Sequence, residues 1–224
     1  MVREAWVRWA YHAVIKLARQ GIEGDLVEAG VFRGGTSCML ARAELFALGA
    51  QRAAAAAQRH EDRRLWLFDT FDGLPPPGER DETLLHEAYS AVEAMRRGNT
   101  SGLSADQLSG LEFRLRKGYI DRSTLKWNHG SEAAVRHNLD RTGYPPALVQ
   151  LVRGKVEDTL RDRAVSLPQR IALLRLDTDF YSSTRAELAE LWPRLVPGGV
   201  LVVDDFWTCI SAATRTLVFP SALD

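Results

Sequence analysis

The sequence predicts an α/β fold built on a doubly wound, mainly parallel sheet. Short apolar segments of strand length occur at 25–29, 65–69, 148–152, 171–176 and 200–203. A glycine-bearing turn and a helical pattern separate the first two segments, which makes a βαβ unit. Because further helical patterns lie between the later segments, we expect one sheet with helices on both faces.

The individual elements follow from local signals. Apolar residues at helical spacing predict a helix over 3–20, which Gly21 closes. Thr36 or Ser37 is expected to cap the helix that follows the first strand. The Pro-Gly-Gly sequence at 197–199 predicts a turn immediately before the last strand.

The span 72–147 interrupts this alternation and is interpreted as an insertion with helical parts. Its segment 75–78 is expected to be a turn or loop, and its segment 98–110 is polar and is expected to be mobile. Neither a repeat nor a linker divides the chain, so residues 1–224 are expected to form a single domain. We interpret this insertion as a lid over the site.

Composition excludes several classes of protein. The 224 residues are 46% hydrophobic and 26% charged, and 29 basic residues balance 29 acidic ones. The zero net charge argues against a nucleic-acid or anionic-membrane partner. The charged N-terminal segment is unlike a signal peptide, and no apolar run has the length of a membrane span. Two distant cysteines predict reduced thiols and a cytoplasmic protein.

Two strand ends carry candidate ligand-binding residues. The first strand runs into Glu28 and a turn that contains Gly30, Gly34 and Gly35, where backbone N–H groups can approach a ligand. The second strand ends at Asp69, which is well placed to accept hydrogen bonds from a ribose diol. The alternatives are a simple tight turn after the first strand and an aspartate that caps the turn after the second.

Four aspartates follow the fourth and fifth predicted strands: Asp177, Asp179, Asp204 and Asp205. Adjacent parallel strands lie about 4.8 Å apart, so these carboxylates are expected to converge. Converging carboxylates repel each other unless a cation neutralises them, and oxygen ligands suit Mg²⁺ or Ca²⁺. The alternative is that at least one of the four faces solvent or caps a turn.

At these residues the chain resembles the macrocin-O-methyltransferase family, which methylates hydroxyls on deoxysugars of macrolides and related natural products. The matching stretches are 24–37, 65–75, 142–160 and 173–206, and they span most of residues 20–206. The resemblance implies a Rossmann-like class I methyltransferase fold. It also implies S-adenosylmethionine as methyl donor, Mg²⁺ as cofactor and a small sugar-bearing acceptor.

The resemblance also implies roles for individual residues. The methionine part of the cofactor would lie against Glu28, Gly30, Val31, Gly34, Gly35, Thr36 and Ser37. Its ribose would bind Asp69, and its adenine would lie near Val156, Glu157 and Asp158. The metal ligands would be Asp177, Asp204 and Asp205, with Asp177 also the favoured catalytic base.

The C-terminal part departs from the family pattern, which continues with a helix and two strands. Residues 207–224 do not resemble that continuation, so the sheet is expected to lack its last strands. The segment 200–203 would then lie at or near a sheet edge, which favours self-association into a homo-oligomer. Three functions stay open: an active sugar O-methyltransferase, a non-catalytic cofactor-binding remnant, and an O-methyltransferase of catechol-like diols.

Overall fold

A computed structural model describes residues 4–53 and 62–204 of the chain. Its sheet has five parallel strands in the order β3-β2-β1-β4-β5. They are β1 Asp25–Ala29, β2 Leu65–Asp69, β3 Val149–Arg153, β4 Ile171–Leu176 and β5 Leu195–Val203. The predicted α/β class and parallel sheet are confirmed. The chain reverses its direction of winding between β1 and β4, which is where open α/β sheets bind ligands.

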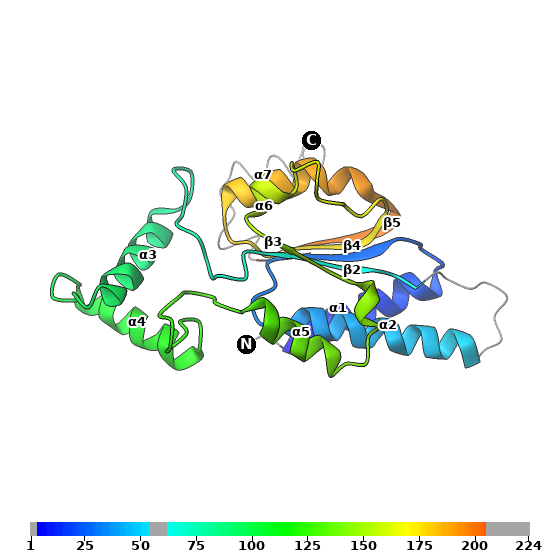
Figure 1. The fold of residues 1–224 in the computed structure, drawn as a ribbon, viewed down its shortest axis with the longest axis horizontal. Coiled ribbons are helices and arrows are strands. Elements are labelled where there is room, and N and C mark those ends of the chain that lie inside the picture. The colour runs from blue at the N-terminus through cyan, green and yellow to red at the C-terminus, as the bar shows by residue number, and fades with distance from the viewer. Residues whose placement is uncertain (1–3, 54–61, 205–224) are drawn as a thin grey trace.

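Helices cover both faces of the sheet (Figure 1). One face carries α1 Glu4–Arg19, α2 Gly35–Ala53 and α5 Glu132–Asp140, and the other carries α6 Val156–Thr159 and α7 Tyr181–Glu190. Alternate strand residues supply two separate apolar layers, with Leu26 and Leu173 in one and Val27 and Leu174 in the other. None of the described helices has both the length and the apolar character that crossing a bilayer requires.

Two local predictions at helix and strand starts were wrong. Thr36 and Ser37 lie inside α2, which begins at Gly35, and the Ser37 hydroxyl donates to Glu28 instead of capping the helix. Strand β5 begins at Leu195, so the Pro-Gly-Gly sequence at 197–199 lies within the strand. The irregularity that these residues introduce appears as a register shift against β4 between Ile171 and Leu173.

The span 72–147 contains two helices that project away from the sheet, α3 Thr83–Arg96 and α4 Ala105–Lys117 (Figure 1). They pack on each other around a small apolar cluster of their own, which includes Val92 and Leu111. The helical parts expected in this span are confirmed. One of them begins within the polar segment 98–110, where Ser104 and Gln107 form a capping box that starts α4.

Short 3₁₀ turns at Pro146–Leu148 and Trp192–Arg194 lead into β3 and β5. Residues 207–224 do not resemble the family's last helix and strands, and they lie outside the described part of the chain. Asp205 lies outside it as well.

Candidate functional site

The carboxyl ends of β1, β4 and β5 place the predicted acids in rows across the sheet. Glu28 of β1 is in register with Arg175 of β4, which is in register with Val202 of β5. Side chains two residues apart on a strand point to the same face. The next row on that face therefore holds Asp177 and Asp204, two of the acids that the sequence predicted to converge.

Gly30 lies directly against the backbone of Asp177, which leaves no room for a side chain at position 30. A Cβ built at Gly30 would lie 1.9 Å from the Asp177 carbonyl oxygen, and Gly30 has a φ of +84°. Backbone hydrogen bonds close this junction, from Gly30 N–H to Phe68 and from Asp177 N–H to Ala29. Glycine is thus required where the turn leaves β1, and the turn is held against the end of β4.

Asp69 holds this turn from the other side. Its Oδ2 accepts hydrogen bonds from the backbone N–H groups of Val31 and Phe32 at 2.7 and 3.0 Å. Its Oδ1 accepts from the N–H of Phe71 at 2.7 Å, which is the turn-capping role considered for this residue. Phe32 and Phe71 both have positive φ, so one carboxylate fixes two left-handed turns at the edge of the cavity.

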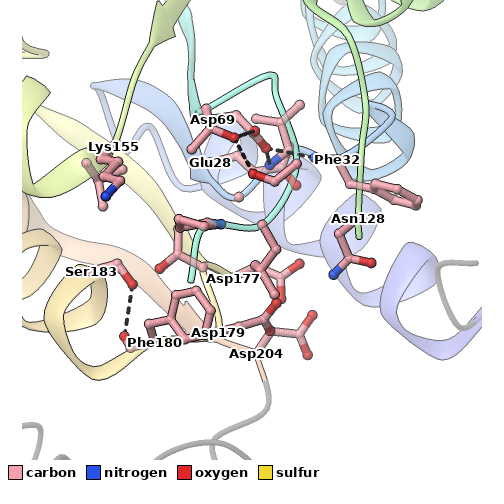
Figure 2. Close-up of a pocket in the computed structure, with 18 of the residues that line it drawn as sticks. Glu28, Phe32, Asp69, Asn128, Lys155, Asp177, Asp179, Phe180, Ser183 and Asp204 are labelled. Carbon is pink, nitrogen blue, oxygen red and sulfur yellow. Dashed lines mark hydrogen bonds between the residues drawn. The ribbon is translucent and has the colours of Figure 1, made fainter. Parts of the chain in front are cut away.

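A cavity of about 330 Å³ opens at this edge (Figure 2). Ten of the predicted site residues line it: Glu28, Gly30, Val31, Gly35, Thr36, Asp69, Val156, Glu157, Asp177 and Asp204. Residues as far apart in the chain as Glu28 and Asp204 therefore meet around one cavity. Figure 2 shows Glu28 and Asp69 close together in one part of the cavity, and Asp179 and Asp204 in another with Asp177 nearby.

Three of the predicted residues that the structure describes do not line the cavity. Ser37 lies behind the lining and donates to Glu28, and Gly34 packs against Val135 of α5. Asp158 belongs to α6 without lining the cavity. The structure therefore groups most, but not all, of the predicted cofactor-binding residues around one space.

Sequence reasoning missed Arg175, which lies between the acids. Its Nη1 lies 2.8 Å from Glu28 Oε1, and its Nη2 lies 2.7 Å from Asp177 Oδ2 and 2.6 Å from Asp204 Oδ2. An arginine alone in an otherwise apolar strand, two residues before a predicted ligand, was the available signal.

Burial sets the electrostatics of this cluster. Desolvation raises the pKa of Asp177 well above its ordinary value, although Arg175 acts against this rise. Desolvation also raises the pKa of Glu28, again opposed by Arg175. Burial works against the charge of Arg175, but its three carboxylate neighbours raise its pKa above the ordinary value. Three carboxylates thus share one permanent positive charge, so the cluster favours a further cation or a proton.

Among the described residues, which exclude Asp205, no group of three or more His, Cys, Asp or Glu side chains is arranged to hold a metal ion. Both described members of the predicted metal site are ion-paired with Arg175. The predicted convergence of Asp177 and Asp204 is confirmed, and the cation that they meet in this structure is a guanidinium.

The insertion contributes residues that the sequence did not indicate. Tyr119 and Asn128 line the cavity, as do Leu74 and Pro75 at the start of the insertion. Asn128 lies across the cavity from Lys155 (Figure 2). No spacing rule connects such residues to the strand ends, because the insertion reaches the site only through its path in space.

Thr178 anchors the loop after β4 to a buried acid. Its hydroxyl donates to Glu187 Oε1 at 2.8 Å, while Glu187 Oε2 is buried with no hydrogen-bond partner. Burial raises the pKa of Glu187 to about 8. A carboxyl group with a raised folded-state pKa stabilises the fold most below its unfolded pKa, and this contribution is lost as pH rises through the folded pKa.

We therefore expect the wild-type free energy of unfolding to fall faster with pH than that of Glu187→Gln. The difference in slope should approach about 1.4 kcal/mol per pH unit between the unfolded and folded pKa values. Urea unfolding at intervals between pH 5 and 8 measures it. Glu190→Gln, a change at a partly exposed position of the same helix, is the control. Equal slopes for wild type and Glu187→Gln would contradict the assignment.

Comparisons with known proteins agree with this architecture. The chain is 30% identical over 195 residues to a tetracenomycin rhamnosyl 4'-O-methyltransferase of Streptomyces olivaceus, covering 87% of this chain and 58% of that protein. It is 29% identical over 211 residues to mycinamicin III 3''-O-methyltransferase of Micromonospora griseorubida, covering 92% and 63%. The chain thus spans less than two thirds of these relatives.

Solved structures show the same fold. The O-methyltransferase NovP superposes with a TM-score of 0.61 at 26% identity, over 96% of this chain and 72% of that one. The calicheamicin methyltransferase CalS11, at 17% identity and a TM-score of 0.55 over 97% and 72%, supports the fold alone. The Rossmann-like class I methyltransferase architecture is therefore confirmed. The family model for macrocin-O-methyltransferase (TylF) matches residues 1–127 and 105–219, so the chain belongs to this family.

Proposed function

We propose that this protein transfers a methyl group from S-adenosylmethionine to a hydroxyl of a sugar-bearing natural product. The observation that carries the proposal is that a glycine-rich turn and a buried carboxylate line the same cavity. The turn offers backbone N–H groups to a cofactor, and Asp177 offers a proton acceptor beside it. The relatives named above are O-methyltransferases, two of them by name of rhamnosyl-tetracenomycin and mycinamicin III.

In this proposal the methionine part of the cofactor lies against the turn that starts at Gly30, with Glu28 beneath it. The ribose diol would donate to Asp69, whose carboxylate already holds the turn, and the adenine would lie near Val156 and Glu157. These three contact regions line one cavity, and they follow β1, β2 and β3, which are neighbours in the sheet in that order. Asp69 would then align the cofactor and the turn together, which favours a reproducible position of the methyl carbon.

Asp177 is proposed as the general base. A sugar hydroxyl is a weak acid, so it becomes a better nucleophile when a carboxylate accepts its proton during methyl transfer. Burial raises the pKa of Asp177 toward the range in which a carboxylate accepts protons effectively. Arg175 holds one oxygen of this carboxylate, which fixes its direction.

We also propose that Asp177 and Asp204, together with Asp205, hold Mg²⁺. The support is electrostatic, because Glu28, Asp177 and Asp204 share the single positive charge of Arg175. Such an excess of carboxylates suits a hard divalent cation with oxygen ligands. When bound, the ion would stabilise the developing alkoxide of the acceptor.

Other features of the proposal concern the whole protein. The projecting pair α3–α4 would act with the 119–128 segment as a lid over the acceptor, since Tyr119 and Asn128 already line the cavity. The protein would act in the cytoplasm as a homo-oligomer. A catechol-like acceptor in place of a sugar would use the same acids, so a panel of sugar-bearing and catechol acceptors distinguishes the two.

Calorimetric titration with S-adenosylhomocysteine tests the proposal, once with Mg²⁺ and once with EDTA. We expect micromolar binding in both conditions, because the contacts proposed for the cofactor do not involve the metal. Titration with ATP is the control, since it shares the adenosine but lacks the homocysteine part. A folded, monodisperse protein that binds no S-adenosylhomocysteine would contradict the proposal.

A further inference from the structure

Arg175 occupies a place in the sheet where a charge is costly. It is the one charged residue of β4, whose other members are apolar, and its side chain is nearly buried. Its neighbours in register are Glu28 on β1 and Val202 on β5. A buried guanidinium needs charged or hydrogen-bonding partners on most of its donors. Here carboxylates on two different sides of the cavity provide them.

The two terminal nitrogens of Arg175 contact different carboxylates. Within residues 4–53 and 62–204, Nη1 forms its ion pair with Glu28, and Nη2 forms ion pairs with both Asp177 and Asp204. A guanidinium is planar and rigid, so the direction of one contact sets the direction of the other. The orientation of Glu28 is therefore tied to that of the two aspartates.

The network continues beyond Glu28 to the helix that follows the glycine turn. The second carboxylate oxygen of Glu28 accepts a hydrogen bond from the Ser37 hydroxyl, in the first turn of α2. A continuous chain of polar contacts therefore runs from α2, through Glu28 and Arg175, to the ends of β4 and β5. Glu28, Arg175, Asp177 and Asp204 all line the cavity, and Glu28 is only 1% exposed.

We propose that Arg175 is a positioning residue that couples the cofactor-binding side of the cavity to its acid pair. This inference rests on the proposed function, in which Glu28 lies under the cofactor and Asp177 acts on the acceptor. Loss of the rigid fork would let Glu28 and the aspartates move independently. Arg175 should therefore influence both cofactor affinity and turnover, through its contacts with Glu28, Asp177 and Asp204.

Arg175→Lys tests this coupling because it keeps the charge and removes the fork. A lysine ammonium is a single point of contact and cannot hold both sides of the cavity at once. We expect the affinity for S-adenosylhomocysteine to fall about tenfold, and turnover at saturating S-adenosylmethionine to fall about a hundredfold. Affinity is measured by calorimetry and turnover with the best acceptor of the panel.

Variants on either side provide matched comparisons. Ser37→Ala, on the cofactor side, should weaken affinity more than it lowers saturated turnover. Asp204→Asn, on the acid side, should abolish turnover while leaving the affinity nearly intact. Only Arg175→Lys should lose much of both, and thermal unfolding of each variant checks that it is folded. A merely structural role would lower thermal stability without this division of effects.

Glu28→Gln provides a second measurement if Arg175→Lys does not fold. It preserves the shape of the side chain and removes the charge that holds Nη1, so it should lower saturated turnover even though Glu28 does not contact the aspartates directly. Normal turnover in Glu28→Gln, or a loss confined to one readout in Arg175→Lys, would overturn the inference alone. Absence of S-adenosylhomocysteine binding by the wild type would overturn the proposed function together with it.

Discussion

Replacing Asp177 with asparagine should lower turnover by about a thousandfold, within the range attributed to a general base. Asparagine keeps an oxygen that can accept from Arg175 but cannot take the acceptor proton. Because the shape and the contact with the guanidinium persist, the affinity for S-adenosylhomocysteine should change by less than about threefold. Turnover at saturating cofactor and calorimetric titration give the two values separately.

Asp179→Asn is the matched control for this prediction. Asp179 lines the same cavity and has a φ of +65°, a left-handed conformation that asparagine also tolerates. If Asp177 is the base, Asp179→Asn should lose much less turnover than Asp177→Asn. Equal losses in both variants, or a parallel loss of cofactor affinity in Asp177→Asn, would show that the base has been assigned to the wrong residue.

The pattern of apolar segments was sufficient to predict the sheet, because parallel strands covered on both faces are short and continuously apolar. The predicted strand over 171–176 agrees with β4 at both ends. Strand β5 begins earlier than predicted because Pro197 and the two glycines after it interrupt the pattern without ending the strand. The start of α4 was missed although Ser104 and Gln107 carry the signature of a capping box.

The acids of the site were predictable because strand ends meet at one edge of a parallel sheet. Arg175 was not, because its partners Glu28 and Asp204 lie 147 and 29 residues away in the chain. Glu187 was likewise unpredictable, since a glutamate in a helix usually faces water. Its burial depends on how α7 packs on the sheet. The role of a residue cannot be predicted from a single sequence when it depends on contacts between distant elements.

A second buried charge network, far from the cavity, should dominate the stability of the fold. Arg63 lies just before β2 and is 4% exposed. Its Nη1 donates to the carbonyl oxygen of Gly24 and its Nη2 to that of Ile22, both at 2.5 Å. These two carbonyl groups lie in the connection between α1 and β1. Its Nε lies 3.3 Å from Glu44 Oε2, and Glu44 is 1% exposed. The Arg63 side chain therefore connects the start of β2 to α2 and to the segment between α1 and β1.

Arg63→Met should lower the free energy of unfolding by about 3–5 kcal/mol, because it leaves Glu44 buried without its charge partner. It also removes the donors from two backbone carbonyl groups, each of which then pays its desolvation cost. Urea unfolding at neutral pH measures the change. The exposed pair Arg136–Glu132 offers a control, since Arg136→Met should cost less than about 1 kcal/mol.

The double variant Arg63→Met/Glu44→Leu separates the charge from the hydrogen bonds. Burial raises the pKa of Glu44 and Arg63 opposes this rise, so Glu44 is costly to the fold mainly when its partner is absent. Removing both charges should recover part of the stability lost in Arg63→Met, since a buried pair can be replaced by apolar side chains at lower cost than one member alone. A double variant less stable than the single one would show instead that the carbonyl contacts to Ile22 and Gly24, and the packing of Glu44, outweigh the ion pair.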